Sequence, residues 1–338
     1  MARVLVAALV AMIISILAGP VFIDFLRRNE FGQHVREELP QQSEKQGTPT
    51  MGGLLIVLAA SLAFLATSDY TLPALTIFGC AVACGAVGFL DDFIKLRHRR
   101  SLGLAGRWKM LLLLGITVAV ALAAHHQELR HDVYVPIVDY WLPLGNAWYV
   151  LLFFMIAGAV NGVNLTDGLD GLAAGTSIIA LFTLTAMAVT IYIRSATATH
   201  GRIETRLDAA FIGAAIIGAA IGFLWFNAFP AEVFMGDTGA MAMGGGIAAM
   251  AIFLKVELLL ILVGGIFLIE AVSVMLQVLS FKYWGRRIFL IAPIHHHFVM
   301  KAWSETKVMV RFWIVTGILC AAGFALFYKY YPQIRPHG

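Results

Sequence analysis

Five short polar segments carry most of the residues that could perform chemistry, and each interrupts a strongly hydrophobic run. They read EKQGTPTMGG at 44–53, GFLDDFIK at 88–95, NGVNLTDGLDGLA at 161–173, FMGDTGA at 234–240 and PIHHHF at 293–298. Together they hold carboxylates, amides, histidines and two lysines, but no cysteine. Carboxylate oxygens suit Mg²⁺, and lysine and histidine can contact phosphate oxygens. These residue types predict a magnesium- and phosphate-binding site if the segments meet in space.

Asp91 and Asp92 are adjacent carboxylates at the end of a hydrophobic run, and several basic residues follow them. Such a pair can bind Mg²⁺, or one member can act as a base or a nucleophile. A solvated helix end would explain an isolated pair without any of these roles. Because other polar segments also carry acids, we predict that this pair belongs to a catalytic site.

Asn164, Asp167 and Asp170 follow one another at intervals of three residues. On a helical turn this spacing would place all three side chains on one side. Asp167 could instead cap the helix that follows. Capping would explain one carboxylate and not the whole polar run, so we predict that the three residues line a binding site.

Asp237 precedes a hydrophobic run rich in glycine and alanine. It could cap that helix, whose N-terminus is also a favourable position for phosphate. A carboxylate there opposes anion binding by itself, but favours it when the carboxylate carries Mg²⁺. Phe234 could stack on a ring or anchor the segment at the membrane interface, and Asn227 adds a polar group upstream.

His295, His296 and His297 form an unbroken triplet. Neighbouring side chains diverge on either a strand or a helix. Three consecutive histidines therefore fit phosphate or hydroxyl contacts better than a single zinc ion.

Four further polar residues are candidates for the same site. Lys45 offers a mobile cation to a phosphate, and Thr50 follows the turn that Pro49 fixes. Glu270 and Gln277 lie inside a hydrophobic run. An intramembrane carboxylate is a functional candidate by default, although it can instead bond a neighbouring helix.

The composition predicts the scaffold that must position these residues. The chain has 338 residues, of which 60% are hydrophobic and 13% charged, with a mean hydropathy of +0.84. A soluble protein of this length needs more polar surface, so we predict an all-α polytopic membrane protein with one domain over 1–338. Crossing about 30 Å of hydrocarbon takes roughly 20 apolar residues. The candidate spans are 3–23, 51–68, 72–90, 110–124, 147–163, 172–193, 209–226, 239–254, 258–280 and 311–328.

The basic residues predict how the chain is oriented. When loops are assigned alternately to two sides, all five polar segments lie on one side. That side holds 15 Lys and Arg residues against 8, with Arg311 at a span edge. The positive-inside rule makes it cytoplasmic and both termini periplasmic. Attraction to anionic lipid explains most of this basic belt, and no nucleic-acid partner is expected.

Acids near basic residues at a membrane surface suggest Mg²⁺ holding a diphosphate, with the spans holding a lipid acceptor. A transporter is the alternative class. Transporters, however, place ionisable groups near the bilayer midplane and carry internal repeats, whereas only Glu270 lies deep in this sequence. The outer segment 132–145 alternates and carries aromatics, which predicts a short hairpin or an interfacial segment.

In order and spacing, TPTMGG, GFLDDFIK, NLTDGLDGLA, FMGDTGA and PIHHHF closely resemble the motifs of the bacterial phospho-N-acetylmuramoyl-pentapeptide-transferases. These belong to the polyprenyl-phosphate N-acetylhexosamine-1-phosphate transferases. The resemblance covers essentially the full chain and implies a ten-span, homodimeric inner-membrane enzyme with Mg²⁺ as cofactor. The reaction it implies takes phospho-MurNAc-pentapeptide from UDP-MurNAc-pentapeptide to undecaprenyl phosphate, giving lipid I and UMP. A sister enzyme that transfers GlcNAc-1-phosphate is the nearest rival, against which TPTMGG and the histidine triplet argue.

The resemblance also implies roles for matching residues. Asp91 and Asp92 match the catalytic aspartate pair, with base and nucleophile both open, and Asp237 matches the magnesium-binding aspartate. The nucleotide-sugar site is matched by Asn164, Asp167, Asp170, Asn227 and Phe234, with Phe234 against uracil. Polar positions around it are matched by Lys45, Thr50, Gln277, His295, His296 and His297. The family pattern continues with Glu after HHHF, where this chain has Val299, so no role is carried over there.

Overall fold

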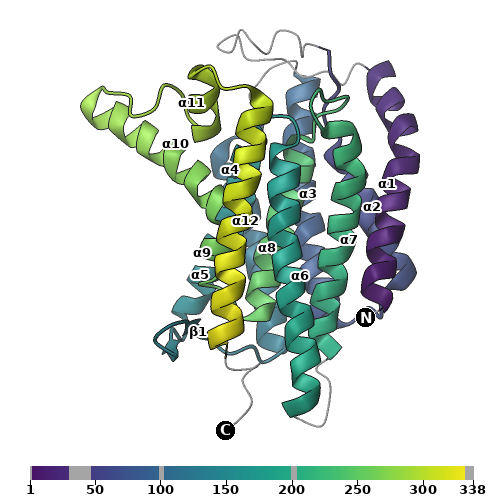
Figure 1. Ribbon diagram of the computed structural model, residues 1–338, viewed down its shortest axis with the longest axis vertical. Helices are drawn as coiled ribbons and strands as arrows, with labels where there is room; N and C mark the ends of the chain where they lie inside the picture. The colour runs from purple at the N-terminus through teal and green to yellow at the C-terminus, as the bar shows by residue number, and fades with distance from the viewer. Residues whose placement is uncertain (1, 30–46, 99–102, 199–203, 332–338) are drawn as a thin grey trace.

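The computed structural model describes residues 2–29, 47–98, 103–198 and 204–331. The chain is a helical bundle with one small hairpin (Figure 1). The helices are α1 Ala2–Arg28, α2 Gly53–Thr67, α3 Leu72–Arg97, α4 Gly106–His126, α5 Ala147–Thr166, α6 Leu172–Ala198, α7 Glu204–Asn227, α8 Gly236–Leu254, α9 Leu260–Val263, α10 Gly265–Trp284, α11 Ile294–Met300 and α12 Glu305–Tyr330. The strands are β1 Asp132–Val135 and β2 Tyr140–Pro143.

The all-α membrane fold predicted from composition is confirmed. Within the described residues, nine helices are long and apolar enough to cross a membrane. The second predicted span, 51–68, corresponds to α2, which is apolar but has only 15 residues. The ninth predicted span, 258–280, is not one helix. It is divided at Gly264 into the single turn α9 and the longer α10, which leaves the bundle at a steep angle (Figure 1).

Helix α8 forms the centre of the bundle, and every residue from Asp237 to Leu254 is buried. Small side chains let neighbouring helices approach closely within a membrane, where packing drives association. A methyl group added at Gly245 would lie 2.8 Å from the Cys84 sulfur of α3, and one at Gly244 would lie 2.7 Å from the Val160 Cα of α5. The Gly/Ala-rich sequence of α8 thus fixes α3 and α5 around it.

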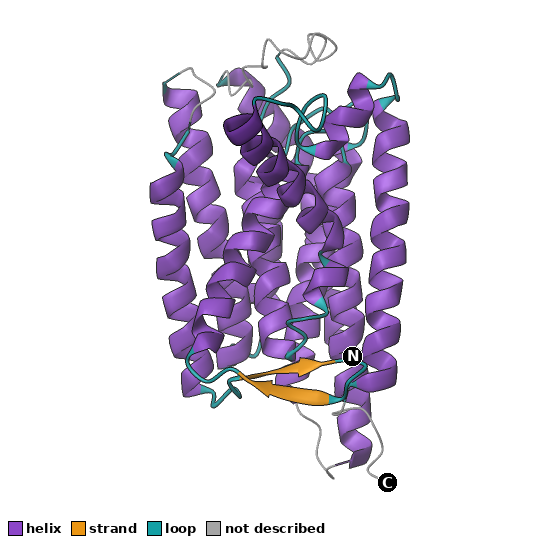
Figure 2. Cartoon of the chain, turned by 90° about the vertical axis from the view of Figure 1, so that its left-hand side faces the viewer, coloured by secondary structure: helices purple, strands orange, loops and turns teal. Residues whose placement is uncertain are grey.

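The predicted hairpin is present, with β1 and β2 antiparallel and Asp132 opposite Pro143. Lys255, just after α8, holds it in place. Its Nζ donates to the Arg130 and Asp132 carbonyl oxygens at 2.8 and 2.7 Å, and to Glu257 Oε1 at 2.7 Å. Helix α1 begins, and α12 ends, at the hairpin end of the bundle, whereas α11 lies at the opposite end (Figures 1 and 2).

Candidate active site

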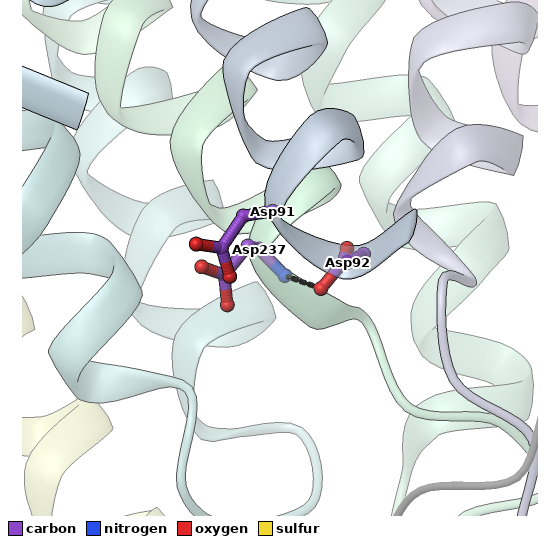
Figure 3. A group of neighbouring side chains, drawn as sticks. All are labelled: Asp91, Asp92 and Asp237. Carbon is purple, nitrogen blue, oxygen red and sulfur yellow. Dashed lines mark hydrogen bonds between the residues drawn. The ribbon is translucent and has the colours of Figure 1, made fainter. Parts of the chain in front are cut away.

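Three carboxylates meet where α3 passes the beginning of α8. Each of Asp91, Asp92 and Asp237 offers an oxygen, and these oxygens all lie within 4.8 Å of one another. The carboxylates of Asp91 and Asp237 lie side by side, while Asp92 approaches the backbone of Asp237 (Figure 3). The pair was predicted at a helix end, but α3 continues to Arg97. Asp91 and Asp92 are therefore fixed by a regular helix.

Asp92 caps α8. Its two carboxylate oxygens accept the Asp237 backbone N–H at 3.2 Å, the Thr238 backbone N–H at 2.9 Å and the Thr238 hydroxyl at 2.8 Å. These amides belong to the first turn of α8, which has no intrahelical acceptor for them. The sequence suggested Asp237 as the cap of this helix, which is wrong, because the capping carboxylate comes from α3.

Asp91 and Asp237 share two lysines. Lys95 Nζ lies 2.6 Å from Asp91 Oδ2 and 2.9 Å from Asp237 Oδ1. Lys109 Nζ lies 2.9 Å from Asp237 Oδ2 and 3.3 Å from Asp91 Oδ1. Asp91 Oδ1 also accepts the Leu104 backbone N–H at 2.8 Å. The two ammonium groups balance the charges of two buried carboxylates. Such pairing is needed because an unpaired buried charge is costly.

Asn164 and Asp167 reach the same cluster from the end of α5. Asn164 Nδ2 donates to Asp237 Oδ2 at 3.2 Å. Burial, followed by the negative charges of Asp237 and Asp92, raises the pKa of Asp167 to about 8, and the Gly236 backbone amide opposes this only in part. Asp167 is therefore largely protonated near neutral pH until a cation offsets the neighbouring charges.

Asp170 does not share a helix face with Asn164 and Asp167, because α5 ends at Thr166 and Gly171 has a φ of +71°. Its carboxylate accepts the Ala231 backbone N–H at 3.1 Å. Asn227, at the end of α7, accepts the Gly171 backbone N–H at 3.1 Å and donates to the Val233 carbonyl at 2.9 Å. Both side chains tie the α5–α6 loop to the α7–α8 loop.

The segment before α2 pairs with the segment before α8. The Phe234 backbone donates to the Pro49 carbonyl and accepts from Gly52, each at 2.8 Å. Thr50 is buried at this junction, and a methyl group on Gly236 would lie 3.2 Å from its hydroxyl oxygen and 2.8 Å from Asp92. Thr50 thus lies close to Asp92, and Phe234 is held beside it by its backbone, whereas Lys45 lies outside the described residues.

The histidine triplet lies on the short helix α11. His295 and His296 face the α5–α6 loop, since a methyl group on Gly168 would lie 2.2 Å from His295 Nε2 and 3.0 Å from His296 Nε2. His297 points elsewhere and its Nδ1 accepts the Leu290 backbone N–H at 3.1 Å. The expected divergence therefore holds for His297 only, because the ring centroids of His295 and His296 lie 4.1 Å apart. Val299 is buried, so an apolar side chain suits its position.

The side-chain amide of Gln277 forms hydrogen bonds with the loop after α10. Its Oε1 accepts the Ile288 and Phe289 backbone N–H groups at 3.1 and 3.0 Å, and its Nε2 donates to the Phe289 carbonyl at 3.0 Å. Direct binding of substrate by Gln277 is therefore not a feature of this conformation.

Gly88 is the residue that lets α3 approach the start of α8. A methyl group there would lie 2.3 Å from the Asp237 carbonyl oxygen, which no side chain can tolerate without a shift of α8. We expect Gly88→Ala to lower turnover about tenfold to a hundredfold, because a displacement of about 1 Å at a reacting centre has that effect. Gly79→Ala is the matched control on the same helix, as nothing lies within 4 Å of its added methyl group. Equal turnover by the two variants would show that this contact does not set the site.

The sequence alone did not place Lys95 and Lys109 beside the acidic cluster. Both were counted in the basic belt that orients the chain. The sequence could have indicated the contact of Lys95, because this residue lies four positions after Asp91 and therefore faces it on a helix. Lys109 comes from α4, and its contact with Asp237 is a matter of tertiary structure.

Two family models match parts of the chain that contain these residues. A family model described as Glycosyl transferase family 4 matches residues 74–255, and one described as Phospho-N-acetylmuramoyl-pentapeptide-transferase signature 1 matches residues 45–57. The first match includes all three carboxylates of the cluster, and the second includes Thr50.

Several proteins named phospho-N-acetylmuramoyl-pentapeptide-transferase are similar over almost their whole length. The one from Rubrobacter xylanophilus is 45% identical, covering 97% of this chain and 98% of the relative. The one from Frankia alni is 44% identical over 100% and 99%. The one from Bacillus subtilis is 40% identical over 95% and 96%.

Proposed function

The chain belongs to the phospho-N-acetylmuramoyl-pentapeptide-transferase family, and we propose from this membership that it makes lipid I for peptidoglycan synthesis. The donor is UDP-MurNAc-pentapeptide, the acceptor is undecaprenyl phosphate, and UMP is released. The protein is a multi-pass protein of the bacterial inner membrane. The observation that carries the proposal is the meeting of Asp91, Asp92 and Asp237 at one end of a membrane-spanning bundle.

In the proposed reaction, an oxygen of the lipid phosphate forms a bond to the sugar-linked phosphorus of the donor. The bond from that phosphorus to the bridging oxygen breaks, and its electron pair leaves with UMP. We propose that Asp91 takes the proton of the acceptor phosphate, because its carboxylate faces Asp237 and both lysines, whereas Asp92 caps α8. Lys95 and Lys109 then offer positive charge to the phosphate oxygens as charge develops in the transition state.

The donor atoms of the cluster fit Mg²⁺, since they are three carboxylates with oxygens within 4.8 Å of one another. We propose that Asp237 holds Mg²⁺, which would neutralise charge on the diphosphate and the departing UMP. Lys95 and Lys109 contact the same oxygens, so their ammonium groups must rearrange as the ion enters.

The remaining residues are proposed to hold the donor. Asn164 and Asp167 lie beside Asp237, and His295 and His296 lie against the loop that carries Asp167. Phe234 is half-buried beside the start of α8, where it can stack on the uracil ring. Lys45 lies five residues before Thr50 in the sequence, and its ammonium group can supply a positive charge to a donor phosphate.

The site lies at the end opposite the hairpin, the end for which the basic belt predicts a cytoplasmic location. The UDP-linked donor is charged and cannot cross the bilayer, so a cytoplasmic site suits it. A homodimer completes the proposal, on the family resemblance alone.

The proposal is tested with purified protein, undecaprenyl phosphate and Mg²⁺. We expect UMP release from UDP-MurNAc-pentapeptide and none from UDP-GlcNAc. Release from UDP-GlcNAc alone would identify the chain as the sister transferase instead. Omitting the lipid provides the control for mechanism: up to one UMP per protein released without lipid would mean a covalent phosphoryl-enzyme, and no release supports direct attack by the acceptor.

A further inference from the structure

Helix α10 carries a stripe of polar side chains that bonds the returning segment 286–295. The stripe consists of Glu270, Ser273, Gln277 and Ser280, at intervals of three or four residues along one face. Ser280 donates to the Arg286 carbonyl at 2.9 Å, and the Ile294 backbone N–H donates to the Ser273 hydroxyl at 3.0 Å. With the bonds of Gln277, these contacts hold the segment that leads into α11.

Glu270 differs from the other three because it contacts a side chain of the candidate active site. Its Oε1 lies 3.0 Å from His295 Nδ1, and both side chains are 0% exposed. A carboxylate oxygen accepts hydrogen bonds, so the contact is satisfied when Nδ1 carries the N–H. The orientation of the imidazole ring is then fixed by Glu270.

The other ring nitrogen, Nε2, is turned toward the α5–α6 loop. It lies against Gly168, one residue after Asp167, and has no hydrogen-bond partner among the described residues. A chain of contacts therefore runs from Glu270 through His295 to the loop that brings Asp167 to the acidic cluster.

We propose that Glu270 is a positioning residue for the donor site, which acts through His295. This inference rests on the proposed function. Glu270 keeps the proton on Nδ1 and the Nε2 edge against Gly168, and so fixes the loop of Asp167. Holding the returning segment does not require a carboxylate, because Ser273, Gln277 and Ser280 do so with neutral groups. A buried acid is costly in a membrane protein, which favours a specific role for the one at Glu270.

The test is the Kd for UDP-MurNAc-pentapeptide, measured by calorimetry with Mg²⁺ and without lipid. Glu270→Gln removes the charge but keeps the shape, and we expect its Kd to rise about tenfold, by analogy with the roughly tenfold to hundredfold loss when the orienting partner of a metal-binding histidine is removed. His295→Ala should give a similar rise. Because Glu270 acts through His295, the double variant should bind no more than about twofold more weakly than His295→Ala alone.

Glu257→Gln is the matched control, because it removes another buried carboxylate at the far end of the bundle, bonded to Lys255 and Trp148. It should lower the melting temperature and leave the Kd unchanged, which separates destabilisation from loss of positioning. A folded Glu270→Gln variant with wild-type Kd, or effects of Glu270→Gln and His295→Ala that multiply, would overturn the inference. Failure of the wild type to bind the donor would instead overturn the proposed function.

Discussion

Asp237→Asn is expected to lower UMP release by at least about a thousandfold while leaving the fold intact. Asp237 is the only carboxylate that contacts both lysines and Asn164 among the described residues. Asparagine keeps the size of the side chain and one acceptor oxygen. It loses the charge that balances Lys95 and Lys109 and that is proposed to hold Mg²⁺. The loss of metal and the loss of electrostatic stabilisation should each affect the transition state strongly.

The measurement is Mg²⁺-dependent UMP release, together with the melting temperature with and without Mg²⁺. An ion that binds only the folded protein stabilises it, so Mg²⁺ should raise the melting temperature of the wild type and not of Asp237→Asn. Asp69→Asn provides the control, because Asp69 pairs with Arg3 on the protein surface away from the cluster. Full Mg²⁺-dependent activity in Asp237→Asn would remove Asp237 from the metal site.

Hydrophobic runs were enough to place the helices, because each apolar span must satisfy its own backbone within lipid. Their lengths were harder to predict. The charged residues Asp91, Asp92 and Lys95 suggest that a span has ended, yet α3 continues through them to Arg97. The reason is that α8 and the two lysines supply partners to these acids, so the helix need not end in water.

The sequence was enough to identify which residue types belong to the site. It was not enough to predict which of them bond other parts of the protein. Asp170, Asn227 and Gln277 are polar residues in the predicted segments, but their side chains bond backbone groups of loops that are distant in sequence. Close contacts that depend on a glycine cannot be predicted from sequence either, as at Gly168, which lies against His295. Both depend on which segments face one another, and periodicity contains no such information.

Asp91→Asn and Asp92→Asn should differ, although the two residues are adjacent and chemically alike. Asp91 faces Lys95, Lys109 and Asp237, whereas Asp92 accepts three hydrogen bonds from the first turn of α8. Asparagine caps a helix about as well as aspartate, but it cannot act as a base or a nucleophile. We therefore expect Asp91→Asn to lose about a thousandfold in turnover, within the range for removal of a general base, and Asp92→Asn to lose about tenfold or less.

Asp92→Ala separates capping from chemistry. Alanine accepts no hydrogen bond, so the Asp237 and Thr238 amides lose their acceptor and stability should fall by about 1–2 kcal/mol. Turnover should fall further than in Asp92→Asn, because the start of α8 carries Asp237. The measurements are the rate of UMP release at saturating donor and lipid, and the unfolding midpoint of each variant. If Asp92→Asn instead loses as much turnover as Asp91→Asn while keeping its stability, then Asp92 is the reacting carboxylate. Its hydrogen bonds to α8 would then serve to orient a catalytic group and not mainly to cap the helix.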